Sequence, residues 1–181
     1  MTLIELIIVL AVIGIMAGVL YQVFITGSLI YTKSKYEEDL IQNARVAMDW
    51  IVRDVRSANT IEIEPDNFEK MTIMYTSTYS IVYQPISTQE NSLVLGRKII
   101  KNRNNTSFSP ITAPDTYLRQ CLFTPIYSTE SPSVAIGVNV KIELVPYNVG
   151  AKKIVKGPIN TVRSFILEGK VYVRKLILNS N

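Results

Sequence analysis

The chain has 181 residues, with 19 Lys or Arg, 15 Asp or Glu, no His and a single Cys, Cys121. This length accommodates one membrane anchor and one modest globular domain. Catalysis by an imidazole base is excluded because there is no His, and Cys121 has no evident activating neighbour in the sequence. We therefore expect a non-enzymatic protein without a cofactor. One Cys cannot form an intrachain disulfide, so we expect Cys121 to be buried in an apolar strand and unreactive.

Residues 1–32 are almost entirely apolar, and no charged side chain occurs from Leu6 to Thr32. At ~1.5 Å per residue this run is long enough to cross a bilayer as a helix. A cleavable secretory signal fits poorly, because no Lys or Arg precedes the run and the run is too long. Glu5 stands inside the apolar block, where a carboxylate costs roughly 2.5–3.5 kcal/mol or more at the bilayer centre. An ordinary anchor does not explain this residue, which needs a partner.

Residues 33–59 are predicted to continue the helix. No Pro occurs before Pro65, and the apolar residues recur at steps of three and four, the period of one helical face. This stripe consists of Leu40, Ala44, Ala47, Ile51, Val55 and Ala58. We expect one helix that is buried in lipid or among other helices over residues 1–32. Over residues 33–59 it is expected to pack on a following domain.

Gly14 and Gly18 lie four residues apart in the apolar segment. Small residues at this spacing allow two helices to approach closely, although each Gly weakens a helix by up to ~1 kcal/mol. We therefore predict that these two positions serve helix packing.

Residues 60–181 are predicted to form an antiparallel β domain, because apolar and polar residues alternate and turn-rich pieces separate the runs. The fold class is thus α+β, with one sheet of about six or seven strands on the helical stripe. We expect a bulge at Gly96, a turn at residues 168–170 and a polar loop over residues 102–115. The expected strands cover residues 60–64, 70–75, 79–84, 92–100, 118–126, 134–145 and 165–178.

Two stretches resemble a known family. The chain's first residues resemble the start of mature type IV pilins and type II secretion pseudopilins: Thr2-Leu3-Ile4-Glu5-Leu6, then Ile7-Ile8-Val9-Leu10-Ala11-Val12-Ile13-Gly14-Ile15. Closest in pattern are the J-type minor pseudopilin and the W-type minor pilin. That likeness rests on Gln42-Asn43-Ala44-Arg45, Arg53-Asp54-Val55-Arg56-Ser57-Ala58, Val82-Tyr83 and Val171-Tyr172-Val173-Arg174. The resemblance implies a pilin-like α+β fold.

The resemblance also assigns roles to the N-terminal residues. In this family a prepilin peptidase removes a short leader and the new first residue is methylated, which implies that Met1 is the methylated residue. The family usually has Phe there, so a start codon in place of the natural residue stays open. Glu5 is expected to pair with the N-terminal amine of Met1 from a neighbouring subunit, with Thr2 hydrogen-bonding nearby. Many pilins have Pro at the position of Gln22, so any melting of the helix is expected at residues 14–18.

The function implied is that of a structural subunit of an extracellular type IV pilus-like filament, held in the membrane by a single pass before assembly. Expected partners are further copies or other pilins, the inner-membrane assembly platform and the prepilin peptidase. Motility, adhesion and secretion are the associated roles. One alternative is a minor pseudopilin that initiates or caps a pseudopilus of a type II secretion system. Another is a singly anchored surface protein that binds a ligand and does not polymerise.

Other candidate sites are weaker. From Ser92 onward there are 13 Lys or Arg against four Asp or Glu. Such a basic bias suits anionic partners, but the basic residues are scattered, so a solvated face is favoured and nucleic acid is not indicated. Asn104 and Asn105 begin two overlapping N-x-[ST] sequons. The acidic residues 37–39, or Asp66 with Glu69, offer oxygen ligands for Ca²⁺, but a solvated face is again favoured and no metal is predicted.

Overall fold

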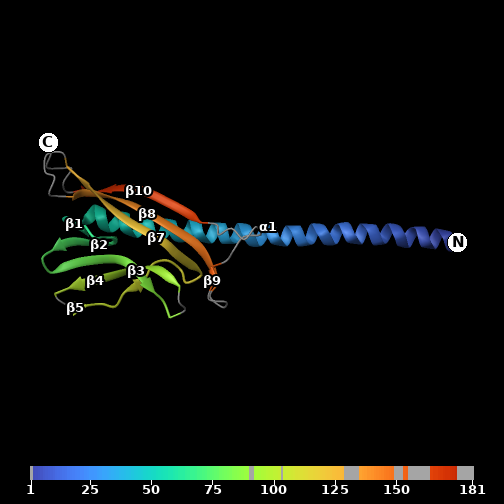
Figure 1. Cartoon of the computed structure of the whole chain (residues 1–181), viewed down its shortest axis with the longest axis horizontal. Helices are drawn as coiled ribbons and strands as arrows, with labels where there is room; N and C mark the ends of the chain where they lie inside the picture. Colours follow the sequence, from blue (N-terminus) through green and yellow to red (C-terminus); the bar gives the residue numbers. More distant parts are fainter. Residues whose placement is uncertain are drawn as a thin grey trace. The chain divides into compact units, whose positions relative to one another are not determined.

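The computed structural model describes residues 2–89, 92–102, 104–128, 135–148, 153–154 and 164–174. These form one helix, α1 (Leu3–Ser57), followed by strands, so the predicted α+β class is confirmed. Figure 1 shows the elements in their order along the chain. The strands are β1 (Thr60–Glu64), β2 (Asn67–Thr76), β3 (Tyr79–Ser87), β4 (Leu93–Lys101), β5 (Asn104–Asn105), β6 (Ser109–Pro110), β7 (Thr116–Tyr127), β8 (Ala135–Asn148), β9 (Lys153–Ile154) and β10 (Phe165–Tyr172).

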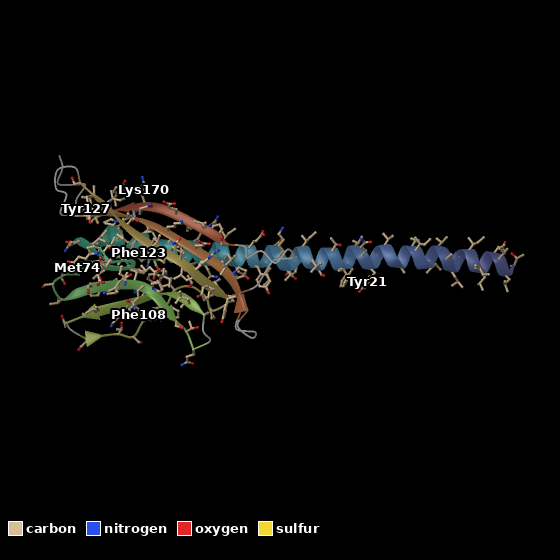
Figure 2. All side chains as sticks on the ribbon, viewed as in Figure 1. Tyr21, Met74, Phe108, Phe123, Tyr127 and Lys170 are labelled. Carbon is tan, nitrogen blue, oxygen red and sulfur yellow. The ribbon has the colours of Figure 1, made fainter. Side chains whose placement is uncertain are left out.

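The chain consists of two compact units, Met1–Glu38 and Asp39–Asn181. In the first unit, residues 2–38 are described, they are helical from Leu3 onward, and every one of them is exposed. Figure 2 shows side chains of this unit, Tyr21 among them, projecting from opposite edges of the helix. The second unit contains the remainder of α1 and all the described strands.

The expectation of a single sheet is wrong, because the described strands form two. One sheet has the order β1-β2-β3-β4-β5, with β6 also paired to β4, and the other has the order β10-β8-β7, with β9 paired to β8. All the pairings are antiparallel. Figure 1 shows β7, β8 and β10 beside one another, with β7 close to β2 and β4 of the first sheet. Two layers arise because β7 pairs with the strand that follows it and not with the six before it.

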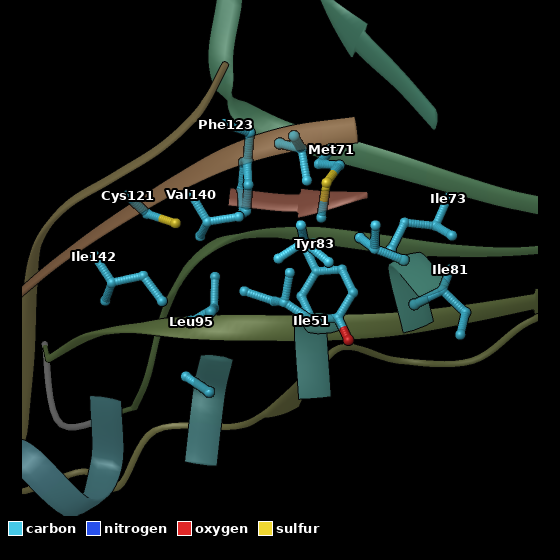
Figure 3. Close-up of a cluster of buried hydrophobic side chains, with 14 of the residues drawn as sticks. Ile51, Met71, Ile73, Ile81, Tyr83, Leu95, Cys121, Phe123, Val140 and Ile142 are labelled. Atoms are coloured by element: carbon cyan, nitrogen blue, oxygen red, sulfur yellow. The ribbon is translucent and has the colours of Figure 1, made fainter. Parts of the chain in front are cut away.

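The helical stripe belongs to one core to which both sheets contribute. All six predicted residues are buried, and they contact apolar side chains from both sheets. Figure 3 shows Ile51 of the helix in one cluster with Tyr83 and Leu95 of the first sheet and Phe123 and Val140 of the second. Full burial of a large aliphatic or aromatic side chain contributes roughly 1.5–3 kcal/mol. The stripe therefore holds the second unit together.

Two glycine predictions are wrong, and close packing explains one of the two residues. Strands β3 and β4 pair without interruption through Gly96, so there is no bulge; a Cβ there would meet the Ile86 side chain at 2.8 Å. Strand β10 runs straight through Gly169, which pairs with Val140, so there is no turn. A Cβ on Gly169 would lie 3.6 Å from Cε of Met48 on the helix, an ordinary contact distance, so the packing does not require Gly at this position.

The other strand boundaries differ more mildly from the predictions. The expected polar loop over residues 102–115 contains β5 and β6, whose residues pair with β4. The predicted last strand extended to Leu178, but residues 175–181 lie outside the described part of the chain.

Candidate functional site

The helix begins with hydrogen bonds between Thr2 and Glu5, two of the residues predicted to act in assembly. The backbone N–H of Thr2 donates to Oε2 of Glu5 over 2.7 Å, and the N–H of Glu5 donates to the carbonyl oxygen of Thr2 over 3.1 Å. Thr followed three residues later by Glu is the capping-box pattern, in which the Glu side chain satisfies a backbone N–H at the helix start. Glu5 therefore has a hydrogen-bond partner within its own chain.

This capping role was not among the sequence-based predictions, which treated Thr2 only as a helper of a contact between subunits. The signal was present, because Thr-Leu-Ile-Glu stands directly before an apolar helical run. Met1 lies outside the described residues. The methylation of Met1 and its pairing with Glu5 of another subunit therefore stay predictions.

The apolar segment beyond Glu5 presents a continuous hydrophobic surface. Large apolar side chains such as Leu3, Val19 and Phe24 are exposed along it. By length and composition α1 contains a segment able to cross a membrane. Monomeric soluble proteins rarely expose apolar patches larger than a few hundred Å². The surface thus fits contact with lipid or with other apolar helices.

Gly14 and Gly18 lie within this surface. A Cβ added to either residue would meet no atom within 4 Å. Nothing in the described chain therefore requires Gly at these positions, and their predicted use in packing against another helix stays a prediction.

A buried polar cluster connects the helix with the first sheet. Asp54 is 5% exposed, and its Oδ2 accepts hydrogen bonds from the Tyr83 hydroxyl at 2.5 Å and from Nε of Arg97 at 2.9 Å. The Tyr75 hydroxyl donates to the backbone carbonyl of Asp54 over 3.1 Å. The Arg97 guanidinium also lies 5.0 Å from the centre of the Trp50 ring. Side chains from β2, β3 and β4 thus converge on one turn of the helix.

The electrostatics of this cluster follow from burial and from the Asp54 carboxylate. Burial raises the pKa of the Tyr83 hydroxyl far above its usual value near 10, and the hydrogen bond to Asp54 raises it further. Burial works to lower the pKa of Arg97, but the contact with Asp54 outweighs it and the net shift is upward. A neutral Tyr and a charged Arg are therefore the stable partners of Asp54. We interpret the cluster as a structural attachment of the helix.

The sequence analysis did not single out Asp54. A signal existed, because residue 54 stands three positions after Ile51 and four before Ala58, on the buried face of the helix. An acid at such a position needs buried donors, and these come from residues 29 and 43 positions away in the chain.

The remaining predicted residues have simpler surroundings. Cys121 is 1% exposed in β7, as predicted, and burial raises its thiol pKa, with Glu69 adding to the effect. Asn104 is exposed, whereas the side chain of Asn105 lies outside the described part. The Thr106 hydroxyl of the first sequon donates to the carbonyl of Ile99 over 2.9 Å. Among the residues that the structure describes, no three Cys, Asp or Glu are grouped to hold a metal ion.

A scan against protein-family models gives no match, and comparisons with curated proteins and with solved structures give none either. The architecture itself can still be described. A long apolar N-terminal helix, whose C-terminal part packs on antiparallel sheets, is a pilin-like arrangement.

Proposed function

We propose that this chain is a structural subunit of an extracellular type IV pilus-like filament, held in the membrane by a single pass of α1 before assembly. One observation carries the proposal: residues 2–38 form a helix that is exposed on every side, while the second unit has a core of its own. An apolar helix whose described residues are all exposed needs lipid or other helices around it. A subunit that moves from a membrane into a bundle of identical helices meets this need in both states.

Glu5 supplies the specific contact of this proposal. In a filament core the carboxylate of one subunit pairs with the N-terminal amine of Met1 in the next, and this pairing sets the axial register. Removing one partner of such a pair leaves a buried unpaired charge, which costs roughly 3–5 kcal/mol. The capping bond from Thr2 uses Oε2 of Glu5, so Oε1 is the atom we assign to the neighbouring amine.

Further partners follow from the same proposal. They are the prepilin peptidase, the inner-membrane assembly platform and other pilins. The proposed role is structural and not enzymatic. A minor subunit that initiates or caps the filament uses the same helix and the same Glu5, and is distinguished by its low copy number along the filament.

The test compares Glu5→Leu with Glu5→Gln. Gln also completes a capping box but carries no charge, whereas Leu removes both the cap and the charge. Pairing with an amine predicts that both variants lose filaments, by about 100-fold in sheared surface material if roughly 3 kcal/mol is lost. Glu38→Gln, which neutralises an exposed acid on the same helix, is the control and is expected to assemble normally.

Each other outcome is informative. Normal assembly of Glu5→Gln together with failure of Glu5→Leu would assign Glu5 to helix capping alone. Normal assembly of both would remove Glu5 from the mechanism. If wild-type protein taken from cell surfaces is never found in filaments or attached to them, the chain is an anchored protein that does not polymerise. A methyl group on Met1, measured by the mass of the native N-terminal peptide, would support leader removal.

A further inference from the structure

The turn between β1 and β2 presents an exposed aromatic side chain among acids. Pairing of the two strands jumps from Ile63↔Met71 to Glu64↔Asn67, so residues 68–70 have no counterpart in β1. Such an irregularity redirects side chains, and Phe68 is 46% exposed. The ion pair of Lys70 with Glu64 spans the irregularity. The exposed acids of this turn are Glu62, Glu64, Asp66 and Glu69.

A groove of complementary character lies elsewhere on the same unit. Its volume is about 560 Å³, and it lies between the C-terminal end of α1 and the end of β10. Its lining combines apolar surface with three cations and contains no acid: Val52, Arg56, Lys170, Val171, Tyr172 and Arg174. Among the described residues β10 pairs only with β8, so the groove borders the outer edge of the second sheet.

We propose that this groove binds the β1–β2 turn of a second copy of the chain, with Phe68 entering the groove and the acids of the turn facing its cations. The pocket is large enough for an aromatic ring, and aromatic anchors in central pockets dominate the energetics of interfaces. The charges are complementary: four acids and Lys70 on the turn face three cations around the groove. Complementary charges of this kind fix the register of an interface and reject wrong partners.

The contact joins two different surfaces of the chain, which decides the kind of assembly it makes. The turn belongs to the first sheet and the groove borders the second. A contact between unlike surfaces leaves one free turn and one free groove after each addition, so it generates a ring or an open helical polymer and not a closed two-fold dimer. This inference rests on the proposed function, because the contact is expected to form within the filament. It adds a contact between β domains to the contact between helices.

Disulfide cross-linking of the full chain in native membranes and in sheared filaments tests the contact. A chain that carries both Phe68→Cys and Lys170→Cys is expected to give a ladder of dimers, trimers and larger species under oxidation. Each single variant is expected to give no such ladder. The native Cys121 does not interfere because it is buried. The control pair is Tyr127→Cys with Lys170→Cys, which also replaces an exposed aromatic residue, and it is expected to remain monomeric.

Charge reversal provides a second test of the contact between the turn and the groove. Arg56→Glu with Lys170→Glu is expected to reduce filament yield about tenfold, because like charges then face one another. Adding Glu62→Lys and Asp66→Lys in the same chain is expected to restore the yield. Phe68→Ala is expected to weaken assembly, whereas Tyr127→Ala is expected to leave it unchanged.

The outcomes separate this inference from the filament proposal. Absence of the ladder in both preparations, or normal yield of the charge-reversed chain, would overturn the groove contact and leave the filament intact. Loss of yield without restoration by the compensating lysines would also overturn it. A ladder in native membranes, combined with wild-type protein that is never found in filaments of its own cells, would support the contact and overturn the filament proposal.

Discussion

The two parts of α1 contain similar aliphatic side chains but differ in what covers them. Residues 3–38 are exposed on every side, whereas the following turns bury one stripe in the core of the second unit. The packing of the second part is thus determined by residues of its own chain. The first part is helical and capped, yet all its described residues are exposed, so its apolar surface remains available to other proteins or to lipid. One continuous helix therefore serves two separate requirements, folding in one part and association in the other.

The largest expected effect comes from breaking the polar attachment of the second part. Asp54→Ala leaves the partly buried Arg97 without its acid, and loss of one partner of a buried ion pair costs roughly 3–5 kcal/mol. We expect the free energy of unfolding to fall by that amount in a guanidinium titration of the detergent-solubilised chain, followed by circular dichroism. Asp49→Ala, at an exposed position of the same helix, is the control and should change stability by less than ~0.5 kcal/mol.

A matched pair of isoleucines sharpens the comparison directly. Ile51 is fully buried, so Ile51→Ala should cost about 2–5 kcal/mol in the same titration. Ile13 is exposed, so Ile13→Ala should leave the stability of the second unit within ~0.5 kcal/mol. An equal loss in the two variants would contradict the separation between the two parts of the helix.

The smallest expected effect is a decrease in the free energy of unfolding at alkaline pH. It arises from Tyr83, which contacts the second part of the helix. The pKa of Tyr83 is raised in the folded state, mainly by burial, so above about pH 10 the unfolded chain loses this proton while the folded chain keeps it. The contribution of Tyr83 to the free energy of unfolding is fully present below pH 10. Above pH 10 it falls by up to about 1.4 kcal/mol per pH unit. Tyr83→Phe should make the decline of stability between pH 10 and 11 less steep by this amount. Identical slopes in the two proteins would rule out Tyr83 as the cause.

The sequence predicts the local parts of this structure well. The stripe from Leu40 to Ala58 is recovered residue by residue, because a period of 3.6 identifies the buried face of a helix without knowledge of its partner. The period-two runs likewise locate the long strands. Burial of Cys121 follows from its apolar strand. The position of Glu5 in an apolar run marks it as an unusual residue. The sequence analysis did not identify its hydrogen bond with Thr2 at the start of the helix.

The features that the sequence does not predict depend on distant residues. Nothing near Gly169 in the sequence indicates that Met48 lies opposite it, so a glycine between charged residues is interpreted as a turn. The division into two sheets depends on whether β7 pairs with β8 or with an earlier strand, and strand periodicity is the same in both cases. The partners of Asp54 are also far away in sequence, so its burial appears only when the sheets are in place.

Trp50 gives the molecule an internal optical reporter. It is the only tryptophan in the chain, and its ring lies 5.3 Å from the guanidinium of Arg53 on its own helix and 5.0 Å from that of Arg97 on β4. One flanking cation moves with the helix and the other with the sheet. A separation of helix from sheet therefore removes one cation from the indole and changes its emission, even where the helix stays wound. Light absorbed at a single residue can thus follow the attachment of the β domain while the subunit is still in the membrane.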